Sequence, residues 1–431
     1  MTAAAQRARI YVYPILSITF VGTLGFSIVL PFLIFLVTRL GGNALIYGVM
    51  GATYSAFQLI GAPILGRWSD RFGRKRVLLL SQLGTLASWG IFLVALALPL
   101  TRMFDVDSPV LGQFTITVPL VVLFLARALD GITGGNVSVA NAYLADITAE
   151  EDRAANFGKM AVASNLGFIF GPAIAAVLGA TAFGEFPPVM AAFLISVVAS
   201  FLIAFRLREQ PPCVLRADPE LANTRKIMGQ EHKECFCMAA TAQLSTGQIL
   251  RLPGIALLLA IYFLVFLAFN FFYIAFPVYA VTDLGWELTD TGLYFSFMGL
   301  VMATVQGPVL KRASAIWSDQ TLVLFGSLLL AASFGFFTSQ TTWVIYAGTV
   351  LLAVGNGLMW PSLMAIISKT AGPDVQGAVQ GLAGSAGAVA SITGLLVGGL
   401  MFGALGGTVF VLSAAITTLV FLMAFAIKPS R

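Results

Sequence analysis

Twelve apolar segments, each about long enough to cross a bilayer, follow one another along this chain. They run near residues 11–37, 45–65, 77–98, 119–143, 157–180, 186–205, 253–280, 291–310, 320–338, 343–368, 376–402 and 408–427. A chain with 58% hydrophobic residues, 10% charged residues and a mean hydropathy of +0.93 cannot fold as a soluble globule with a charged surface. The sequence therefore predicts an all-α membrane protein, and the first segment is too long for the core of a signal peptide.

The segments form two groups of six, which predicts a first half at 1–205, a cytoplasmic linker at 206–251 and a second half at 252–431. An even number of spans puts both termini on one side. If the charged stretch GRWSDRFGRKR is cytoplasmic, all but three of the 24 Lys and Arg residues are cytoplasmic as well. Arg39 and Arg102 then lie outside, and Arg127 lies within a span. The positive-inside rule predicts cytoplasmic termini, and it explains the pI near 9.2 without nucleic-acid binding.

A weak internal duplication supports two parallel halves. A shift of 245 residues places one set of loop residues over another: Pro63, Leu65, Arg67 and Ser69 over Pro308, Leu310, Arg312 and Ser314. The second copy has Ala315 and Ser318 where the first has Asp70 and Gly73.

The loop between the second and third segments resembles the signature of the major facilitator superfamily, and the resemblance extends over essentially the whole chain. The matching residues are Gly66, Asp70, Arg71, Gly73, Arg74, Lys75 and Arg76. The resemblance implies twelve transmembrane helices in two six-helix halves. It also implies that this loop is a gating latch, in which Gly66 allows close helix approach and Asp70 makes contacts between the halves. The alternative is a solvated, positive-inside loop.

The fourth segment contains charges at a depth where they are costly. Arg127 and Asp130 are three residues apart and can pair on one helix face, which Gly134, Ser138 and Asn141 continue. A charge near mid-bilayer costs about 2.5 to 3.5 kcal/mol, so a retained pair is expected to line a polar cavity. Alternatively, both residues lie near a membrane end and simply pair. The sequence around Arg127 also resembles the antiporters' fourth-span signature, in which the Arg is linked to proton coupling.

The fifth segment is similar to the signature of drug antiporters. Gly158, Gly167, Gly171 and Pro172 have its spacing, although Ala175 and Ala176 replace its closing glycines. The spacing of Gly167 and Gly171 also suits ordinary close helix packing. Together with the run GITGGNVSVANAYLADIT, this segment favours a resemblance to the tetracycline efflux group.

One departure from that group concerns the first segment, where those proteins have an acidic residue and this chain has Gly22 nearby. By the bounds above, Asp130 is the carboxylate inside a span, and it is therefore the candidate proton carrier. Desolvation disfavours the charged form of Asp130 and Arg127 favours it, so substrate binding or a conformational change can alter its protonation.

We expect export of small lipophilic compounds in exchange for protons, by a monomer in the cell inner membrane. Solute uptake or facilitated diffusion, and a non-transporting receptor or scaffold, are the alternatives.

Other polar or aromatic residues within the segments are candidates for contact with a hydrophobic substrate. They are Gln58, Asn270, Tyr273, Gln306, Asn356 and Trp360, and for each the alternative is interhelical hydrogen bonding or an interfacial position.

The linker contains His232, Cys235 and Cys237, which lack a fourth ligand and standard zinc spacing. We therefore expect no metal and no cofactor. Because the chain has one His and it lies in the linker, we expect no enzymatic activity.

Overall fold

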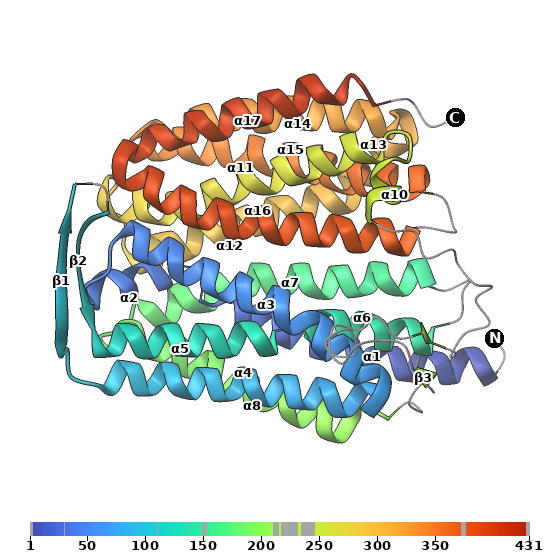
Figure 1. The fold of residues 1–431 in the computed structure, drawn as a ribbon, viewed down its shortest axis with the longest axis horizontal. Coiled ribbons are helices and arrows are strands. Elements are labelled where there is room, and N and C mark those ends of the chain that lie inside the picture. Colours follow the sequence, from blue (N-terminus) through green and yellow to red (C-terminus); the bar gives the residue numbers. More distant parts are fainter. Residues whose placement is uncertain are drawn as a thin grey trace. The chain divides into compact units, whose positions relative to one another are not determined.

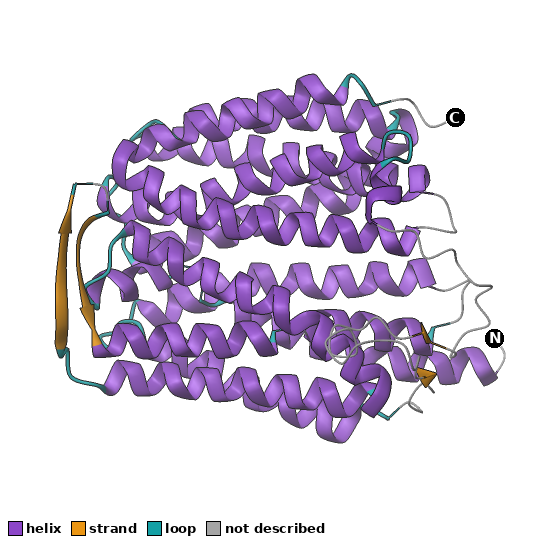
Figure 2. Ribbon diagram, in the orientation of Figure 1, coloured by secondary structure: helices purple, strands orange, loops and turns teal. Residues whose placement is uncertain are grey.

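A computed structural model describes residues 3–29, 31–109, 111–134, 136–148, 153–209, 215–216, 232–233, 246–371 and 376–427. Most of the described chain is helical (Figure 2). Every one of the twelve predicted segments coincides with helix, which confirms the predicted fold class. The side chains of Asp70, Ser138 and His232 lie outside the described part, as do Cys235 and Cys237 and most of the predicted linker.

Within the described residues, nine helical stretches are long and apolar enough to cross a membrane. One of them, Val379–Ala424, contains two predicted segments. A shorter apolar helix, Val12–Ser27, covers part of the first predicted segment, and the fourth predicted segment is divided between two shorter helices. The chain is thus an integral membrane protein with all twelve predicted segments helical.

The chain forms two compact units. The first comprises Met1–Leu36, Thr53–Phe104 and Ile116–Cys237, and the second comprises Val37–Ala52, Asp105–Thr115 and Met238–Arg431. The elements of the first unit are α1 (Ala3–Ser27), α4 (Arg74–Ala97), α5 (Val118–Thr133), α6 (Asn136–Ile147), α7 (Arg153–Gly179), α8 (Phe186–Arg206) and the short antiparallel strands β3 (Leu215–Arg216) and β4 (His232–Lys233). Four elements have residues in both units: α2 (Leu33–Arg39), α3 (Ala44–Phe72), β1 (Arg102–Ser108) and β2 (Gly112–Thr117).

The second unit contains the remaining helices. They are α10 (Thr246–Leu250), α11 (Ile255–Thr282), α12 (Leu288–Thr304), the π-helical turn η2 (Val305–Val309), α13 (Leu310–Ile316), α14 (Asp319–Phe336), α15 (Thr342–Ala371), α16 (Gln376–Leu405), the 3-10 turn η3 (Gly406–Thr408) and α17 (Val409–Ala424).

Three predicted segments are not continuous α-helices, and in each case the sequence offers a local reason. The first is divided into α1 and α2 near Pro31, whose ring nitrogen cannot donate a helical hydrogen bond. The fourth is divided into α5 and α6 after Gly134, the first of two successive glycines, which are weak helix formers. The eighth widens into the π-turn at Pro308. The sequence predicted the fourth segment as one helix, whereas the structure describes it as two, α5 and α6.

A β-hairpin, which the all-α prediction did not include, joins α4 to α5 at one end of the helices (Figure 1). Gly112, the first residue of β2, has a φ of 75°. Strand β2 is fixed to the α2–α3 turn, because the Thr115 amide donates to the Gly41 carbonyl over 2.8 Å. Asn43 donates to the Leu111 carbonyl at 3.0 Å and accepts from the Ile46 amide at the start of α3.

Close helix packing in the first unit depends on the glycines of α7. A Cβ at Gly167 or Gly171 would meet the backbone of α1 within about 3 Å, and the Ser27 hydroxyl donates to the Gly167 carbonyl at 2.8 Å. The small-residue surface predicted in the fifth segment therefore packs against α1. Gly158 has no neighbour within 4 Å of such a Cβ among the described residues, and Pro172 lies inside α7.

Candidate functional site

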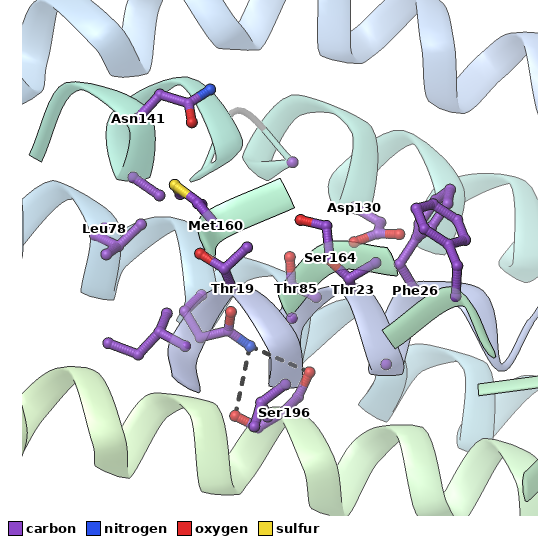
Figure 3. A pocket seen from close by; sticks show the side chains of 18 of the residues that line it. Thr19, Thr23, Phe26, Leu78, Thr85, Asp130, Asn141, Met160, Ser164 and Ser196 are labelled. Atoms are coloured by element: carbon purple, nitrogen blue, oxygen red, sulfur yellow. Dashed lines mark hydrogen bonds between the residues drawn. The ribbon is translucent and has the colours of Figure 1, made fainter. Parts of the chain in front are cut away.

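A cavity of about 570 Å³ lies inside the first unit, between α1, α3, α4, α5, α6, α7 and α8 (Figure 3). Hydroxyl groups from four helices, α1, α4, α7 and α8, face it, and they belong to Thr19, Thr23, Thr85, Ser164 and Ser196. Its volume is within the range of small-molecule sites in proteins.

The fourth predicted segment supplies Asp130, the one charged residue in the described lining of this cavity. Its carboxyl oxygen lies 3.3 Å from a terminal nitrogen of Arg127, and each residue is only 5% exposed. The Thr85 side chain of α4 lies beside the carboxyl group (Figure 3). The spacing of three residues does place the two charges on one face of α5, and both are buried within the protein.

The guanidinium of Arg127 is held by an ion pair and an aromatic ring. Its central carbon lies 4.6 Å from the centroid of the Tyr54 ring, a cation–π contact. Its Nε has no hydrogen-bond partner among the described residues, although it is buried. A buried donor without a partner is costly, so Arg127 is not optimised for stability alone.

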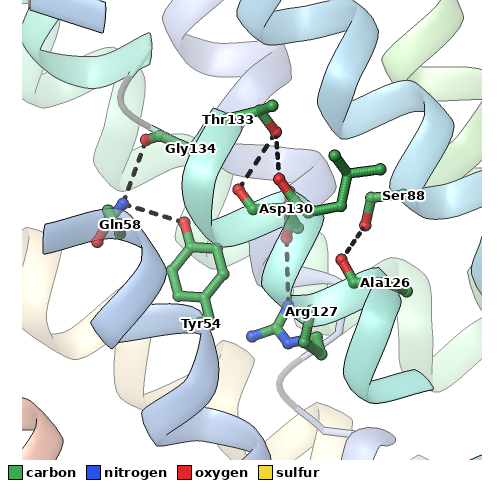
Figure 4. A network of polar contacts seen from close by, with 9 residues as sticks. Tyr54, Gln58, Ser88, Ala126, Arg127, Asp130, Thr133 and Gly134 are labelled. Atoms are coloured by element: carbon green, nitrogen blue, oxygen red, sulfur yellow. Dashed lines mark hydrogen bonds and ion pairs between the residues drawn. The ribbon is translucent and has the colours of Figure 1, made fainter. Parts of the chain in front are cut away.

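The interruption between α5 and α6 leaves backbone carbonyls that neighbouring helices satisfy (Figure 4). The Gln58 amide of α3 donates to the Gly134 carbonyl at 3.2 Å and to the Tyr54 hydroxyl at 3.1 Å. The Ser81 hydroxyl of α4 donates to the Thr133 carbonyl. The junction is thus stabilised by neighbouring side chains, of which Gln58 also lines the cavity.

Glycines bring these helices close enough for the network to form. A Cβ at Gly131 would lie 2.5 Å from the Tyr54 carbonyl oxygen and 2.8 Å from the Phe57 Cβ. A Cβ at Gly61 would meet the Ile132 backbone, and one at Gly84 would meet the Thr133 side chain. Side chains at these positions would push α3 and α4 away from α5.

Sequence reasoning missed a second polar group in the cavity, formed by Gln82 of α4 and Ser196 of α8. The Gln82 amide donates to the Ser196 hydroxyl at 3.3 Å and to its carbonyl at 3.5 Å, and both residues are 3% exposed. The available signal was a glutamine within the apolar segment 77–98. The four-residue spacing of Thr19 and Thr23 in α1 was a similar signal.

The loop signature at residues 66–76 is mostly helical, because α3 continues to Phe72 and α4 begins at Arg74. Only Gly73, with a φ of 99°, interrupts the two helices. The Arg71 guanidinium lies over the Phe72 ring. A Cβ at Gly66 would have no neighbour within 4 Å among the described residues.

Two carboxylates hold the start of α4. The Arg74 Nε lies 2.7 Å from the Asp146 carboxylate, and its Nη1 donates to the Ser69 hydroxyl at 2.7 Å. Glu209 accepts a hydrogen bond from the Lys75 amide at 3.1 Å and lies 3.8 Å from Arg76. A carboxylate is favourable at a helix N-terminus, so Glu209 takes the place of a capping side chain.

The predicted cavity residues fall into two groups. Gln58 and Asn141 line the cavity of the first unit. The remaining candidates with described side chains do not line it: Asn270, Tyr273, Gln306, Asn356 and Trp360.

Those remaining candidates take part in packing within the second unit. The Asn270 amide donates to the Phe266 carbonyl at 2.8 Å and to the Ser391 hydroxyl at 3.2 Å. The Trp360 ring packs on Tyr262 and Phe266, with centroids 4.9 and 5.0 Å away.

The other three candidates are also engaged with neighbours. The Tyr273 ring contacts the Phe269 and Phe295 rings. The Asn356 amide lies 3.8 Å from the Met302 sulfur, and half-buried Gln306 lies in the π-turn.

Comparison with known proteins gives a consistent result. A model of the Major Facilitator Superfamily matches residues 15–336 and 307–431. The chain is 29% identical to the class D tetracycline resistance protein of Salmonella ordonez over 421 residues, which are 96% of each protein. It is 29% identical to the class B protein of Escherichia coli, covering 85% of this chain and 82% of that one.

It is also 27% identical to multidrug resistance protein 1 of Bacillus subtilis, covering 92% and 91% of the two chains. Among solved structures, a D-xylose-proton symporter superposes with a TM-score of 0.72 at 15% identity, covering 97% of this chain and 98% of that one. A human organic anion transporter gives a TM-score of 0.68 at 21% identity, covering 97% and 99%. These two structures bear on the fold alone.

Proposed function

Because this chain belongs to the major facilitator superfamily and is a transporter, we propose that it exports small, mainly lipophilic compounds in exchange for protons. The curated relatives named for tetracycline and multidrug resistance support the direction and the substrate class. In this proposal the protein acts as a monomer in the cell inner membrane, with both termini in the cytoplasm.

The observation that most supports this proposal is the buried Arg127–Asp130 pair beside the cavity. A carboxylate that faces a substrate cavity and is held by one guanidinium has two states, paired and protonated. Proton uptake weakens the pair, and proton release restores it, so substrate binding and proton binding compete through Asp130. Rocking of the two halves would present this carboxyl group to each side of the membrane in turn.

The start of α4 is proposed as the latch that responds to this rocking. The links of Arg74 to Asp146 and of Lys75 and Arg76 to Glu209 fix the α3–α4 junction to the ends of α6 and α8. A junction held by charged contacts at the protein surface can open without disturbing the apolar core.

Reconstituted vesicles give the test of this function. An imposed pH gradient should drive accumulation of a lipophilic compound against its own gradient, and a protonophore should abolish the accumulation. Empty vesicles are the control for passive partition. A compound that only equilibrates, whatever the pH gradient, would contradict proton-coupled export.

A second candidate function, solute uptake or facilitated diffusion, is supported by the cavity face of α1. That face contains Thr19, Gly22 and Thr23 and no carboxylate, unlike the first span of tetracycline efflux proteins. Transport that is insensitive to protonophore would favour this alternative.

A further inference from the structure

From the lining of the cavity, we infer that the first unit binds an uncharged aromatic compound whose hydrogen-bonding group displaces the contact between Gln82 and Ser196. This inference rests on the proposed transport function and specifies its substrate class.

The charge of the lining is the first argument. Among the described lining residues, Asp130 is the one that is charged, and it is already paired with Arg127 at 3.3 Å. A cationic ligand must compete with Arg127 for that carboxylate, and an anionic ligand meets no cationic side chain in the described lining. Burying an unpaired charge is far more costly than burying a neutral polar group, so the cavity favours uncharged compounds.

One wall of the cavity is aromatic. The Phe26 ring of α1 lies 5.5 Å from the Tyr54 ring of α3 and 6.3 Å from the Phe168 ring of α7, centroid to centroid. All three residues line the cavity, and Trp89 lines it as well. Aromatic side chains stabilise a flat ring by offset or edge-to-face contacts.

The polar pair of Gln82 and Ser196 supplies a group that a ligand can replace. Their two hydrogen bonds, at 3.3 and 3.5 Å, are longer than the usual 2.7 to 3.2 Å. A ligand carbonyl can accept a hydrogen bond from the Gln82 amide with better geometry. Because the two hydrogen bonds to Ser196 are long, breaking them costs little of the binding free energy. Both side chains are buried, yet both line the cavity, so the exchange needs no opening of the helix bundle (Figure 3).

Three acridine derivatives with one ring shape and three charges test this inference. Acridone is neutral, with one carbonyl acceptor and one N–H donor, 10-methylacridinium is a fixed cation, and acridine-9-carboxylate is an anion. Binding to the full-length protein in lipid nanodiscs is followed by fluorescence anisotropy, with empty nanodiscs subtracted. We expect acridone to bind at least about tenfold more tightly than either charged compound, a difference of roughly 1.4 kcal/mol.

Variants then locate the hydrogen-bonding group. Gln82→Met and Ser196→Ala should each weaken acridone binding about threefold to tenfold, as expected for a lost hydrogen bond. Ser88→Ala is the matched control, because the Ser88 hydroxyl is buried in α4, donates to the Ala126 carbonyl at 2.8 Å and does not line the cavity. Melting temperatures of all variants separate loss of binding from loss of folding.

Failure of acridone to bind the wild type, or 10-methylacridinium binding as tightly as acridone, would overturn the inference. Unchanged acridone affinity in both well-folded cavity variants would overturn it as well. If any of these results were found together with uphill transport of a charged compound, the proposed function would still stand. Normal acridone binding without uphill transport of any compound would instead overturn the proposed function alone.

Discussion

In the first unit, an ion pair, a cavity and an interrupted helix lie among α3, α4 and α5, whereas aromatic rings fill the interior of the second unit. Phe272, Phe276, Tyr294, Phe337 and Phe410 are all fully buried there. Phe276 and Tyr294 stack with their centroids 4.2 Å apart. If the two halves derive from one duplicated sequence, the first has kept buried polar groups that are costly. The second has buried aromatic side chains packed in its interior. Among the described residues, the comparison thus separates a buried ion pair beside a cavity in the first unit from a cluster of buried aromatic rings in the second.

The largest expected effect on stability belongs to the aromatic interior of the second unit. Phe276→Ala removes contacts with Phe272, Tyr294 and Phe337. We expect a loss near the lower end of about 3 to 5 kcal/mol, because lipid is already apolar and only packing is lost. Thermal unfolding in detergent measures it, and Phe325→Ala, at a residue that is 44% exposed, is the control. A Phe276→Ala protein as stable as the control would remove the distinction between the units.

Close glycine contacts allow the two units to be compared directly, because helices pack backbone to backbone in both of them. A Cβ at Gly131 would lie 2.5 Å from the Tyr54 carbonyl oxygen, and one at Gly355 would lie 2.7 Å from that of Gly326. Alanine at either position should cost about 1 to 3 kcal/mol through overpacking.

Of these two variants, only Gly131→Ala should also weaken ligand binding, because Gly131 packs against Tyr54, which lines the cavity. Binding measured below the melting temperature checks this, with Gly158→Ala and Gly335→Ala as controls, since a Cβ at these positions has no described neighbour within 4 Å. Equal loss of binding in the Gly131 and Gly355 variants would contradict a separation of roles.

The smallest expected effects on stability come from two surface ion pairs whose aligned positions carry opposite charges. The 245-residue shift places Arg74, which pairs with Asp146 at 2.7 Å, over Asp319, which pairs with Lys369 at 2.6 Å. Breaking an exposed pair should cost no more than about 1 kcal/mol.

Arg74→Ala should slow transport more than Lys369→Ala, because Arg74 also donates to Ser69 and lies in the proposed latch. Initial transport rates at equal expression measure the difference. The double change Arg74→Asp with Asp146→Arg should recover part of the transport rate. If the rate does not recover, the ion pair itself is not what supports transport.

Sequence reasoning found the elements that depend on local pattern. Each of the twelve segments that hydropathy located is helical, and the spacing of Arg127 and Asp130 predicted that they can pair. It did not find the division after Gly134, because the apolar run continues across the glycines. Gln82 and Ser196 meet although they are 114 residues apart, so only the tertiary arrangement shows that they form one group.

The candidates in the second unit show why residue type leaves the role of a side chain open. Asn270 and Trp360 have the residue types of a binding site, but their side chains are engaged in contacts with α16 and α11. Residue type alone does not separate a substrate contact from an interhelical contact, since both require a polar or aromatic group inside an apolar helix.

The ratio of uphill transport to substrate exchange in vesicles containing Asp130→Asn tests the central claim most directly. Exchange of labelled for unlabelled substrate needs the cavity but no proton, whereas accumulation against a gradient needs the proton. Asparagine keeps the size of the side chain and cannot ionise. We predict near-normal exchange with loss of pH-driven accumulation, and accumulation at the wild-type level in this variant would contradict a role for Asp130 in coupling.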